Sequence, residues 1–460
     1  MRLSPARTKY AFGIAIAALL AGCSGGAQFS PQNLAGASLH SRHVRPLSAA
    51  DSVLYAFTAG KSDGSNPNGS PVIDSKGALY GTSMNTPGGV GLVWKLTPSG
   101  STYKESVLYT FPKDKSQGAY PQAGLAMDSS GALYGTASAG GKGKCTNGCG
   151  TIFKLAPSKN GYTESVLYDF GLKSTDGTLP DAALLLVGSE LYGTTEYGGT
   201  GKCSLFGVNG CGTVFELSTK GSGYKILYSF KGGSKDGNYL QTSVVADKNG
   251  VLYGTTNNGG KTGSGGVTSC PAGCGIVFSV TPKGAEKVLH FFAGGKDGGI
   301  PSRGRGVYVG PTGIIVGTTQ VAGSGGCGLG FLQGCGVVFE LKPSGKTYKE
   351  SIVYTFQPSN DMQAPNEELI ADKSGNLYGT AFLGGGGSCM LGCGGIFKLT
   401  ASKGTYTEGV AYQFQGGKDG ALPYAGVSID SSGNLFGTTY EGDGASGCSL
   451  GCGTVYELTP

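Results

Sequence analysis

Charged residues are scarce in this sequence: only 14 % of its 460 residues are Asp, Glu, Lys or Arg, against about 25 % in typical globular proteins. Histidine is rarer still, with three copies, and tryptophan occurs once. The composition also excludes a mainly helical protein, because 88 residues are glycine and each glycine inside a helix costs about 1 kcal/mol. The glycines follow no three-residue period, which excludes collagen, and a 38 % hydrophobic content excludes a long disordered chain. Short strands joined by dense turns remain.

The N-terminus carries an apolar run that is too short to span a bilayer as a helix. It extends over residues 10–20, follows three basic residues, and precedes Leu20-Ala21-Gly22-Cys23. Such an order is typical of a secretory signal, and a cysteine after Leu-Ala-Gly resembles the bacterial lipobox, in which the thiol receives diacylglycerol. We therefore expect residues 1–22 to be a lipoprotein signal peptide and Cys23 to anchor an exported protein to the bacterial cell envelope, at the outer membrane if the cell has one.

Positive charge is too sparse to indicate a nucleic-acid partner. The formal net charge is +6, and cleavage removes three basic residues and no acidic one, which leaves +3 without a basic cluster. Residues 23–50 are rich in Ser, Gly, Ala, Pro and Gln and show no periodicity. We interpret them as a lipidated flexible tether ahead of a folded domain at residues 51–460.

A repeated unit fills that domain. The motif Leu-Tyr-Gly-Thr, or a close variant, recurs at intervals of 54 to 63 residues and begins at Leu79, Leu133, Leu191, Leu252, Ile315, Leu377 and Leu435. Each copy follows a strand-like run and, in most units, a D-x-x-G turn, and precedes a Gly-rich loop and two further strand-like runs. In the second unit the four expected strands cover 123–128, 132–137, 151–155 and 165–170. Four antiparallel strands per repeat predict an all-β propeller of seven four-stranded blades.

The two ends of the repeat region complement each other. Residues 52–57 form a fourth strand with no first three before it, and residues 453–458 form a third strand with no fourth after it. Pairing these two segments would complete the seventh blade and close the ring, which removes an open sheet edge.

These motifs carry a family resemblance. D-x-x-G-x-L-Y-G-T-T, a Gly-Gly loop, G-T-V-F-x-L and x-V-L-Y-x-F together resemble the bacterial GloVer (Gloeo_Verruco) tandem repeat over residues 52–460. The resemblance implies an exported propeller-like repeat protein and no particular activity. The sequence departs from the pattern at Ile315-Val316-Gly317, at His290 and at Gly188-Ser189-Glu190.

Twelve cysteines remain besides Cys23, and each of the last six units has two of them after its second strand. The pairs are Cys145 with Cys149, Cys203 with Cys211, Cys270 with Cys274, Cys327 with Cys335, Cys389 with Cys393, and Cys448 with Cys452. Zinc would need about four Cys or His ligands per site, and no histidine is near. Six disulfides, each within the Gly-rich loop of one blade, fit an exported protein better. The sequence predicts no metal site and no cofactor.

The loops after the second and fourth strands should share one face of the ring and hold the candidate binding residues. The Asp-Gly steps of the loops after the fourth strands are explained by turn chemistry, with ligand or cation contact as the alternative. Their aspartates are Asp63, Asp176, Asp236, Asp297 and Asp419. Glu196, Glu441 and Asp443 break the repeat and could supply the carboxylates of a glycoside hydrolase. The recurrent aromatics could stack on sugars, although packing between blades explains them better.

We therefore expect a monomeric, lipid-anchored propeller that binds or scaffolds a glycan or an envelope protein without catalysis. The alternatives are a carbohydrate-active enzyme with carboxylates at the channel mouth and a purely structural surface protein.

Overall fold

The computed structural model describes residues 52–60, 63–86, 89–100, 102–205, 208–263, 270–302, 304, 306–323, 326–329, 332–358, 361–402, 405–442, 448 and 450–460. The expected signal peptide (1–22), the tether (23–50), the lipidated Cys23 and Asp443 lie outside these residues. The chain divides into a unit of residues 1–43 and a unit of residues 44–460, and the second unit contains the strands described below.

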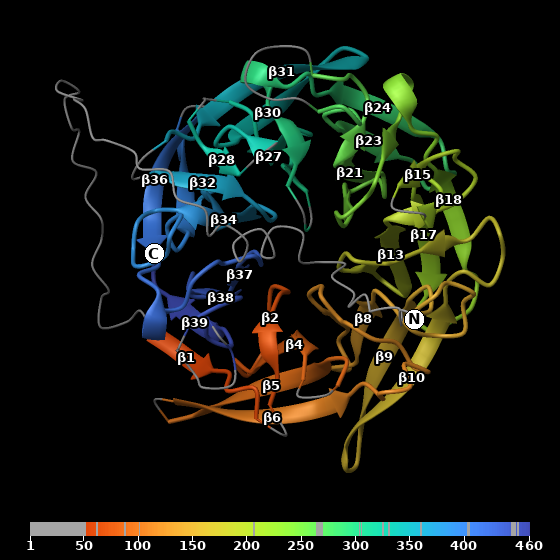
Figure 1. Cartoon of the computed structure of the whole chain (residues 1–460), viewed down its shortest axis with the longest axis vertical. Coiled ribbons are helices and arrows are strands. Elements are labelled where there is room, and N and C mark those ends of the chain that lie inside the picture. Colours follow the sequence, from red (N-terminus) through yellow and green to blue (C-terminus); the bar gives the residue numbers. More distant parts are fainter. Residues whose placement is uncertain are drawn as a thin grey trace, which may run out of the picture. The chain divides into compact units, whose positions relative to one another are not determined.

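Seven small antiparallel sheets stand in a ring (Figure 1). The innermost strands are β3 (Val72–Ile73), β7 (Ala126–Met127), β12 (Leu185–Val187), β20 (Val245–Ala246), β26 (Val307–Val309), β33 (Ile370–Ala371) and β37 (Ser428–Ile429). The second strands are β4 (Leu79–Asn85), β8 (Leu133–Ala137), β13 (Glu190–Thr195), β21 (Leu252–Thr256), β27 (Ile315–Val321), β34 (Leu377–Gly384) and β38 (Leu435–Thr439).

The third strands of the blades are β5 (Leu92–Ser99), β9 (Thr151–Ser158), β17 (Thr213–Ser218), β23 (Ile276–Val280), β30 (Val337–Ser344), β35 (Gly395–Ser402) and β39 (Thr454–Leu458). The outermost strands are β6 (Thr102–Thr110), β10 (Gly161–Asp169), β18 (Lys225–Ser229), β24 (Glu286–Phe291), β31 (Thr347–Thr355), β36 (Thr405–Gln413) and β1 (Ser52–Ala56). The predicted seven-bladed, all-β propeller is confirmed.

Short elements decorate the loops. They are β2 (Ser65–Pro67), β11 (Gly177–Thr178), β14 (Tyr197–Gly198), β15 (Ser204–Leu205), β16 (Val208–Asn209), β19 (Gly237–Asn238), β22 (Asn258–Gly259), β25 (Gly299–Pro301), β28 (Gly328–Leu329), β29 (Leu332–Gln333), β32 (Met362–Pro365) and the 3-10 turns η2 (Gly233–Lys235), η3 (Gly295–Asp297) and η4 (Gly417–Asp419). Within the described part of the chain, no helix is long and apolar enough to cross a membrane.

The ring closes as predicted. β1 pairs antiparallel with β39, with Ser52 opposite Glu457 and Ala56 opposite Thr454, so the two ends of the colour scale meet in one blade (Figure 1). The seventh sheet thus takes its outermost strand from the start of the domain and its other three from the end. This arrangement leaves neither of these two strands as an open edge on that side.

An aromatic belt fills the space between neighbouring blades, as predicted for the recurrent rings. In every case the phenylalanine after an outermost strand packs on the third-strand aromatic of the next blade, with ring centroids 4.9 to 5.8 Å apart. The seven pairs are Phe57–Trp94, Phe111–Phe153, Phe170–Phe215, Phe230–Phe278, Phe292–Phe339, Phe356–Phe397 and Phe414–Tyr456. Six of these pairs meet edge-on and Phe57–Trp94 is tilted. Such aromatic contacts stabilise beyond area burial, so the belt ties all seven blades together.

The glycine of Leu-Tyr-Gly-Thr makes room for this belt. Gly135 lies directly opposite Phe153 in the β8–β9 ladder, and a Cβ on Gly135 would come within 2.5 Å of the Phe153 ring. The threonine of the same motif reaches the next blade, because Thr136 Oγ1 donates to the Ala182 carbonyl at 3.0 Å. The motif therefore encodes packing within a blade and a hydrogen bond to its neighbour.

Candidate functional site

One face of the ring gathers two loop sets, as the sequence predicts. The crossover that leads from each outermost strand into the next blade pairs with the end of the second strand of that blade. This occurs through strand pairs such as β11–β14 and β19–β22, and through bridges such as Ala119–Ala139 and Ala421–Glu441. The crossovers and the cysteine-bearing loops therefore form one connected surface.

All six predicted cysteine pairs have disulfide geometry, with Cα–Cα separations of 5.0 to 5.3 Å. The prediction of six disulfides within single blades is confirmed, and disulfides in this number are typical of extracellular or exported proteins. The bonds join Cys145 to Cys149, Cys203 to Cys211, Cys270 to Cys274, Cys327 to Cys335, Cys389 to Cys393, and Cys448 to Cys452.

The location of the second cysteine of each pair differs from the prediction, which places both cysteines in a Gly-rich loop. The structure makes it a core residue, with at most 1 % of its surface exposed, because the chain turns inward just before the third strand. It packs with the belt of its blade boundary, as Cys452 does in the cluster that contains Phe57 and Trp94. These buried cysteines are Cys149, Cys211, Cys274, Cys335, Cys393 and Cys452. The disulfides therefore tie the loops to the core through their second cysteines.

The disulfides also brace the crossovers. Six crossovers donate a backbone N–H to the carbonyl of the second cysteine of the preceding blade. The donors and acceptors are Asn66 and Cys452, Leu179 and Cys149, Tyr239 and Cys211, Ile300 and Cys274, Ala364 and Cys335, and Leu422 and Cys393. In the blade without cysteines, Tyr120 donates to Val90 instead.

All seven of these donors have a left-handed backbone, with φ between 51° and 62°. Residues other than glycine adopt this conformation at a cost. The loops around each crossover, including the disulfide where there is one, must therefore hold it in place.

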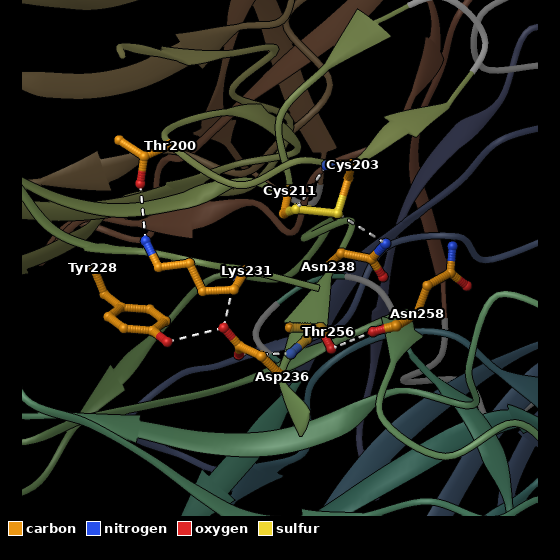
Figure 2. Close-up of a disulfide and its surroundings, with 10 residues drawn as sticks. Thr200, Cys203, Cys211, Tyr228, Lys231, Asp236, Asn238, Thr256 and Asn258 are labelled. Atoms are coloured by element: carbon orange, nitrogen blue, oxygen red, sulfur yellow. Dashed lines mark hydrogen bonds between the residues drawn. A yellow bond between two sulfur atoms is a disulfide. The ribbon is translucent and has the colours of Figure 1, made fainter. Parts of the chain in front are cut away.

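Figure 2 shows one braced crossover, at the disulfide between Cys203 and Cys211. Asn238 Nδ2 contacts Cys203 Sγ at 3.5 Å, and Asp236 accepts from the Tyr228 hydroxyl at 2.9 Å and from the Lys231 backbone N–H at 2.7 Å (Figure 2). The carboxylate therefore joins the crossover to the outermost strand.

The five candidate aspartates, Asp63, Asp176, Asp236, Asp297 and Asp419, all occupy this position. Each accepts a backbone N–H from its own crossover at 2.6 to 3.0 Å. Four of them also bond a side chain of the outermost strand, from Tyr168, Tyr228, His290 and Tyr412. Asp361, which the sequence pattern missed, makes the same bonds with Tyr354 and Gln357. The turn chemistry accounts for these carboxylates, and ligand contact by them stays a prediction.

The two candidate glutamates lie on different blades. Glu196, at the end of β13, is 6 % exposed, and Gln241 Nε2 lies 3.4 Å from its Oε1. Glu441 pairs through its backbone with Ala421, and burial raises the pKa of its carboxyl. They belong to the third and seventh blades, which are not neighbours in the ring.

Two sets of positions at the channel mouth vary from blade to blade. The first mouth ring lies two residues after each left-handed residue and consists of Asn68, Gln122, Asp181, Gln241, Ser302, Asn366 and Tyr424. The second mouth ring follows Leu-Tyr-Gly-Thr by two residues and consists of Met84, Ser138, Glu196, Asn257, Gln320, Phe382 and Tyr440.

A central cavity of about 300 Å³ opens among residues of the first mouth ring. Six of the seven residues of the first mouth ring line it, together with Glu367 and Glu368, and its apolar wall includes Val72, Leu125 and Ile370. Its described lining contains carboxylates, amides and a tyrosine but no lysine, arginine or histidine. Within the described residues, the charged side chains of the lining are carboxylates.

Hydrogen bonds connect the mouth rings across blades and fix their side chains. Gln122 Nε2 donates to Asp181 Oδ1 at 2.8 Å, and Asn366 Nδ2 donates to the Tyr424 carbonyl at 2.8 Å. Gln320 Nε2 donates to Asn366 Oδ1. Polar groups held in this way need little rearrangement on binding.

An aromatic cluster stands at one side of the mouth, between the sixth and seventh blades. Tyr424 stacks on Phe382 with centroids 5.0 Å apart and planes inclined by 18°, and it meets Tyr440 edge-on at 5.2 Å. Both tyrosines are partly exposed. Burial, Tyr424 and Glu441 raise the pKa of Tyr440 to about 12, so its hydroxyl stays protonated and can donate at neutral pH.

Among the residues described, no group of three or more His, Cys, Asp or Glu side chains could hold a metal ion. Of the two mouth rings, the sequence pattern identified only Glu196, because the other members do not belong to the repeated motifs. The signal lay in the positions that differ between otherwise similar units.

The chain is similar to one known sequence family and to several solved structures. The sequence model of the Gloeobacter/Verrucomicrobia repeat matches residues 43–268, 89–331 and 266–460. A chain of a nidogen/laminin complex is 13 % identical, with 70 % of this chain and 91 % of that chain covered and a TM-score of 0.36. A putative gluconolactonase is 13 % identical, with coverages of 67 % and 84 % and a TM-score of 0.34. A protein of unknown function from Dyadobacter fermentans is 12 % identical, with coverages of 89 % and 98 % and a TM-score of 0.40. No curated protein matches the sequence at a significant level.

Proposed function

The chain belongs to the Gloeobacter/Verrucomicrobia repeat family, and we propose that it is a lipid-anchored binding module of the cell envelope that holds a glycan at its channel mouth. Its repeat domain is a seven-bladed propeller, and its six disulfides indicate an extracellular or exported protein. The fold suits a scaffold that presents loops rigidly.

One observation carries the proposal: sequence variety is concentrated at the channel mouth. The belt, the turns and the crossover aspartates recur from blade to blade, whereas the two mouth rings hold eight residue types at fourteen positions. A residue that serves the ring can repeat in every blade, but a residue that contacts an asymmetric ligand must differ. The cavity of about 300 Å³ lies at the first of these mouth rings and approaches the usual size of a small-molecule site.

The chemistry of the mouth suits a carbohydrate. Amide side chains both donate to and accept from hydroxyl groups, and carboxylates accept from them; the mouth offers both types in Gln122, Asp181 and Asn366. The partly exposed rings of Tyr424 and Tyr440 add apolar faces with polar tips, on which a sugar ring can stack. Because Asp181, Glu367 and Glu368 line the cavity, we expect neutral or amino sugars to bind better than acidic ones.

The anchor belongs to the same proposal. Cys23 after Leu20-Ala21-Gly22 provides the lipidation site, and residues 24–50 provide the tether between membrane and propeller. Lipidation with several acyl chains would anchor the protein stably. We expect Cys23→Ser to move the protein from the membrane fraction to the soluble fraction, and continued membrane association of that variant would refute the anchor.

A hydrolytic role is the weaker candidate. Glycosidases need two carboxylates within about 5–10 Å of each other across the scissile bond. Glu196 and Glu441 belong to blades that are not neighbours, and the first of them is engaged by Gln241. The fold therefore does not bring this particular pair of carboxylates together.

A glycan panel tests the proposal directly. The Cys23→Ser chain, exported and unanchored, is applied to neutral, amino and acidic oligosaccharides, and bound sugars are checked for cleavage. We expect saturable binding of a neutral or amino sugar that is recovered intact. Recovery of a cleaved product would favour the enzyme. Binding of no sugar would refute the glycan, and an envelope pull-down would then separate a protein partner from a purely structural role.

A further inference from the structure

The outer wall of the ring contains a repeated pair of polar groups that neither the fold nor the binding proposal requires. In several blades a tyrosine or histidine of the outermost strand forms a hydrogen bond with the aspartate of the following crossover, or with the residue that replaces this aspartate. A glutamate lies four residues before this tyrosine or histidine and faces the preceding blade. These glutamates include Glu105, Glu164, Glu286 and Glu350. We call each boundary between two neighbouring blades a seam.

Each of these four glutamates has a buried Oε1 atom without a hydrogen-bond partner. A buried carboxylate oxygen without a partner is costly, and it is less costly when the group is neutral. The seam that contains Glu105 has a second such oxygen. Asp63 is 7 % exposed, and its Oδ1 is also buried without a hydrogen-bond partner. Asp63 raises the pKa of Glu105 by its charge, so the two carboxyl groups are close enough to interact.

Two seams show which chemistry the position accepts. In the third blade, Tyr224 replaces the glutamate, and its hydroxyl donates to Asp176 Oδ1 at 2.9 Å. In the crossover before the second blade, Gln117 replaces the aspartate and accepts from the Tyr109 hydroxyl, opposite Glu164. In the first case a neutral tyrosine replaces the glutamate, and in the second a neutral glutamine replaces the crossover aspartate. In both cases two carboxylate charges do not lie next to each other.

We propose that the seam glutamates are protonated in the folded ring at mildly acidic pH, and that the ring is a pH-dependent assembly. It is held most tightly when these groups are neutral, and it loosens at the seams as they ionise. The exported propeller is thereby suited to acidic surroundings outside the cell. This inference concerns the outer wall and stands apart from the proposed glycan site.

The titratable groups around the glutamates act in the required direction. Burial raises the pKa of Glu105 and Glu286 to about 7, and the charges of Asp63 and Asp236 add to the effect. Burial alone raises the pKa of Glu164 to about 7, and the nearby Tyr109 is neutral. Glu350 has a raised pKa through burial and Asp297, while His290 acts in the opposite sense. At the fourth blade, the neighbouring Tyr228 acts in the opposite sense and lowers the pKa of Glu286 in part.

The sign of the pH dependence follows from these shifts. A glutamate whose folded pKa is about 7 and whose unfolded pKa is 4.5 binds its proton more tightly in the ring. Its stabilising contribution is fully present below pH 4.5 and is lost as the pH rises through about 7. Most small proteins lose stability on acidification instead, so the dependence expected between pH 5 and 8 distinguishes the proposal.

The experiment follows thermal unfolding of the full chain between pH 5 and 8 for wild type, Glu286→Gln and the control Glu190→Gln. Glutamine mimics a protonated glutamate, and Glu190 lies at the start of β13, away from the seams. We expect the wild-type midpoint to fall on going from pH 5 to 8. Glu286→Gln should match wild type at pH 5 and exceed it by about 2–4 °C at pH 8, and the control should follow wild type.

Other outcomes overturn the proposal. A midpoint of Glu286→Gln that is lowered equally at both ends of the range would assign the glutamate an acceptor role as a carboxylate. A gain at pH 8 on adding calcium to wild type, lost in the variant, would assign the pair to a shared cation. Carboxyl-carbon NMR of wild-type glutamates gives a second readout that does not depend on any variant. Absence of a glutamate that titrates near neutral pH would contradict the proposal.

Discussion

The seams and the mouth of this propeller are built from the same repeat, yet they use it in opposite ways. At the seams each blade presents a phenylalanine to the next, seven times without exception. At the mouth, corresponding positions hold residues as different as Asp181, Ser302 and Tyr424. Uniform positions serve the symmetry of the ring, and we interpret the variable ones as serving a ligand. In a symmetric scaffold, departures from the repeat are therefore the more informative residues for function.

The largest effect should come from removing one ring of the aromatic belt. Phe278 is fully buried and lies 4.9 Å from Phe230, measured between centroids, so Phe278→Ala leaves a cavity at a seam. We expect the free energy of unfolding to fall by about 3–5 kcal/mol, as measured by chemical denaturation.

The matched control is Met390→Ala, at a side chain that is 82 % exposed, which should stay within about 0.5 kcal/mol of wild type. Equal effects of the two variants would mean that the belt does not hold the blades together.

A smaller effect should follow from removing one disulfide by Cys203→Ser with Cys211→Ser. The short loop should cost about 2 kcal/mol, and the Tyr239 N–H, which bonds the Cys211 carbonyl at 3.2 Å, should exchange faster with deuterium. Tyr120, which bonds Val90 in the blade without cysteines, provides the internal comparison and should be unchanged. Unaltered exchange at Tyr239 would show that the disulfide does not brace the crossover.

A turn aspartate on the opposite face should contribute less to the free energy of unfolding, and its contribution should depend on pH. Asp128 accepts from Ser130, Ala132 and the Tyr134 hydroxyl, and although burial acts the other way, these bonds lower its pKa. Its stabilisation is therefore present above its unfolded pKa of 3.8 and is lost as the pH falls through the folded value.

We expect Asp128→Asn to cost about 1 kcal/mol at pH 6 and to differ less from wild type at pH 3, measured by denaturation at both pH values. A constant difference would mean that the charge of Asp128 plays no part in the turn.

Much of this fold was predictable from sequence because it depends on local, repeated signals. The Leu-Tyr-Gly-Thr spacing, the strand left over at each end and the paired cysteines identified the seven blades, the closure and the disulfides. Boundaries were less accurate: the predicted third and fourth strands of the second blade, 151–155 and 165–170, extend in the structure to β9 (Thr151–Ser158) and β10 (Gly161–Asp169). Hairpin pairing carries them past the apolar core into polar residues, which a hydrophobic pattern does not detect.

The individual hydrogen bonds between blades could not be predicted, because they join residues about 50 apart that share no local pattern. The hydrogen bond from Thr136 to Ala182 is one example. Asp361 was missed because methionine follows it where glycine follows the other crossover aspartates. The left-handed crossover residues also escaped detection, since the sequence places tyrosine, isoleucine and leucine at these positions instead of glycine.

The most direct measurement compares the affinity for the best sugar of the panel in three variants of the Cys23→Ser chain. Tyr424→Ala and Asp181→Asn alter the mouth, and Tyr103→Ala alters an outermost strand. We predict that the two mouth variants keep the thermal midpoint within a few degrees of wild type and lose about tenfold or more in affinity, while Tyr103→Ala binds as wild type does. Unchanged affinity in both mouth variants, or a loss confined to Tyr103→Ala, would contradict the assignment of ligand binding to the variable rings.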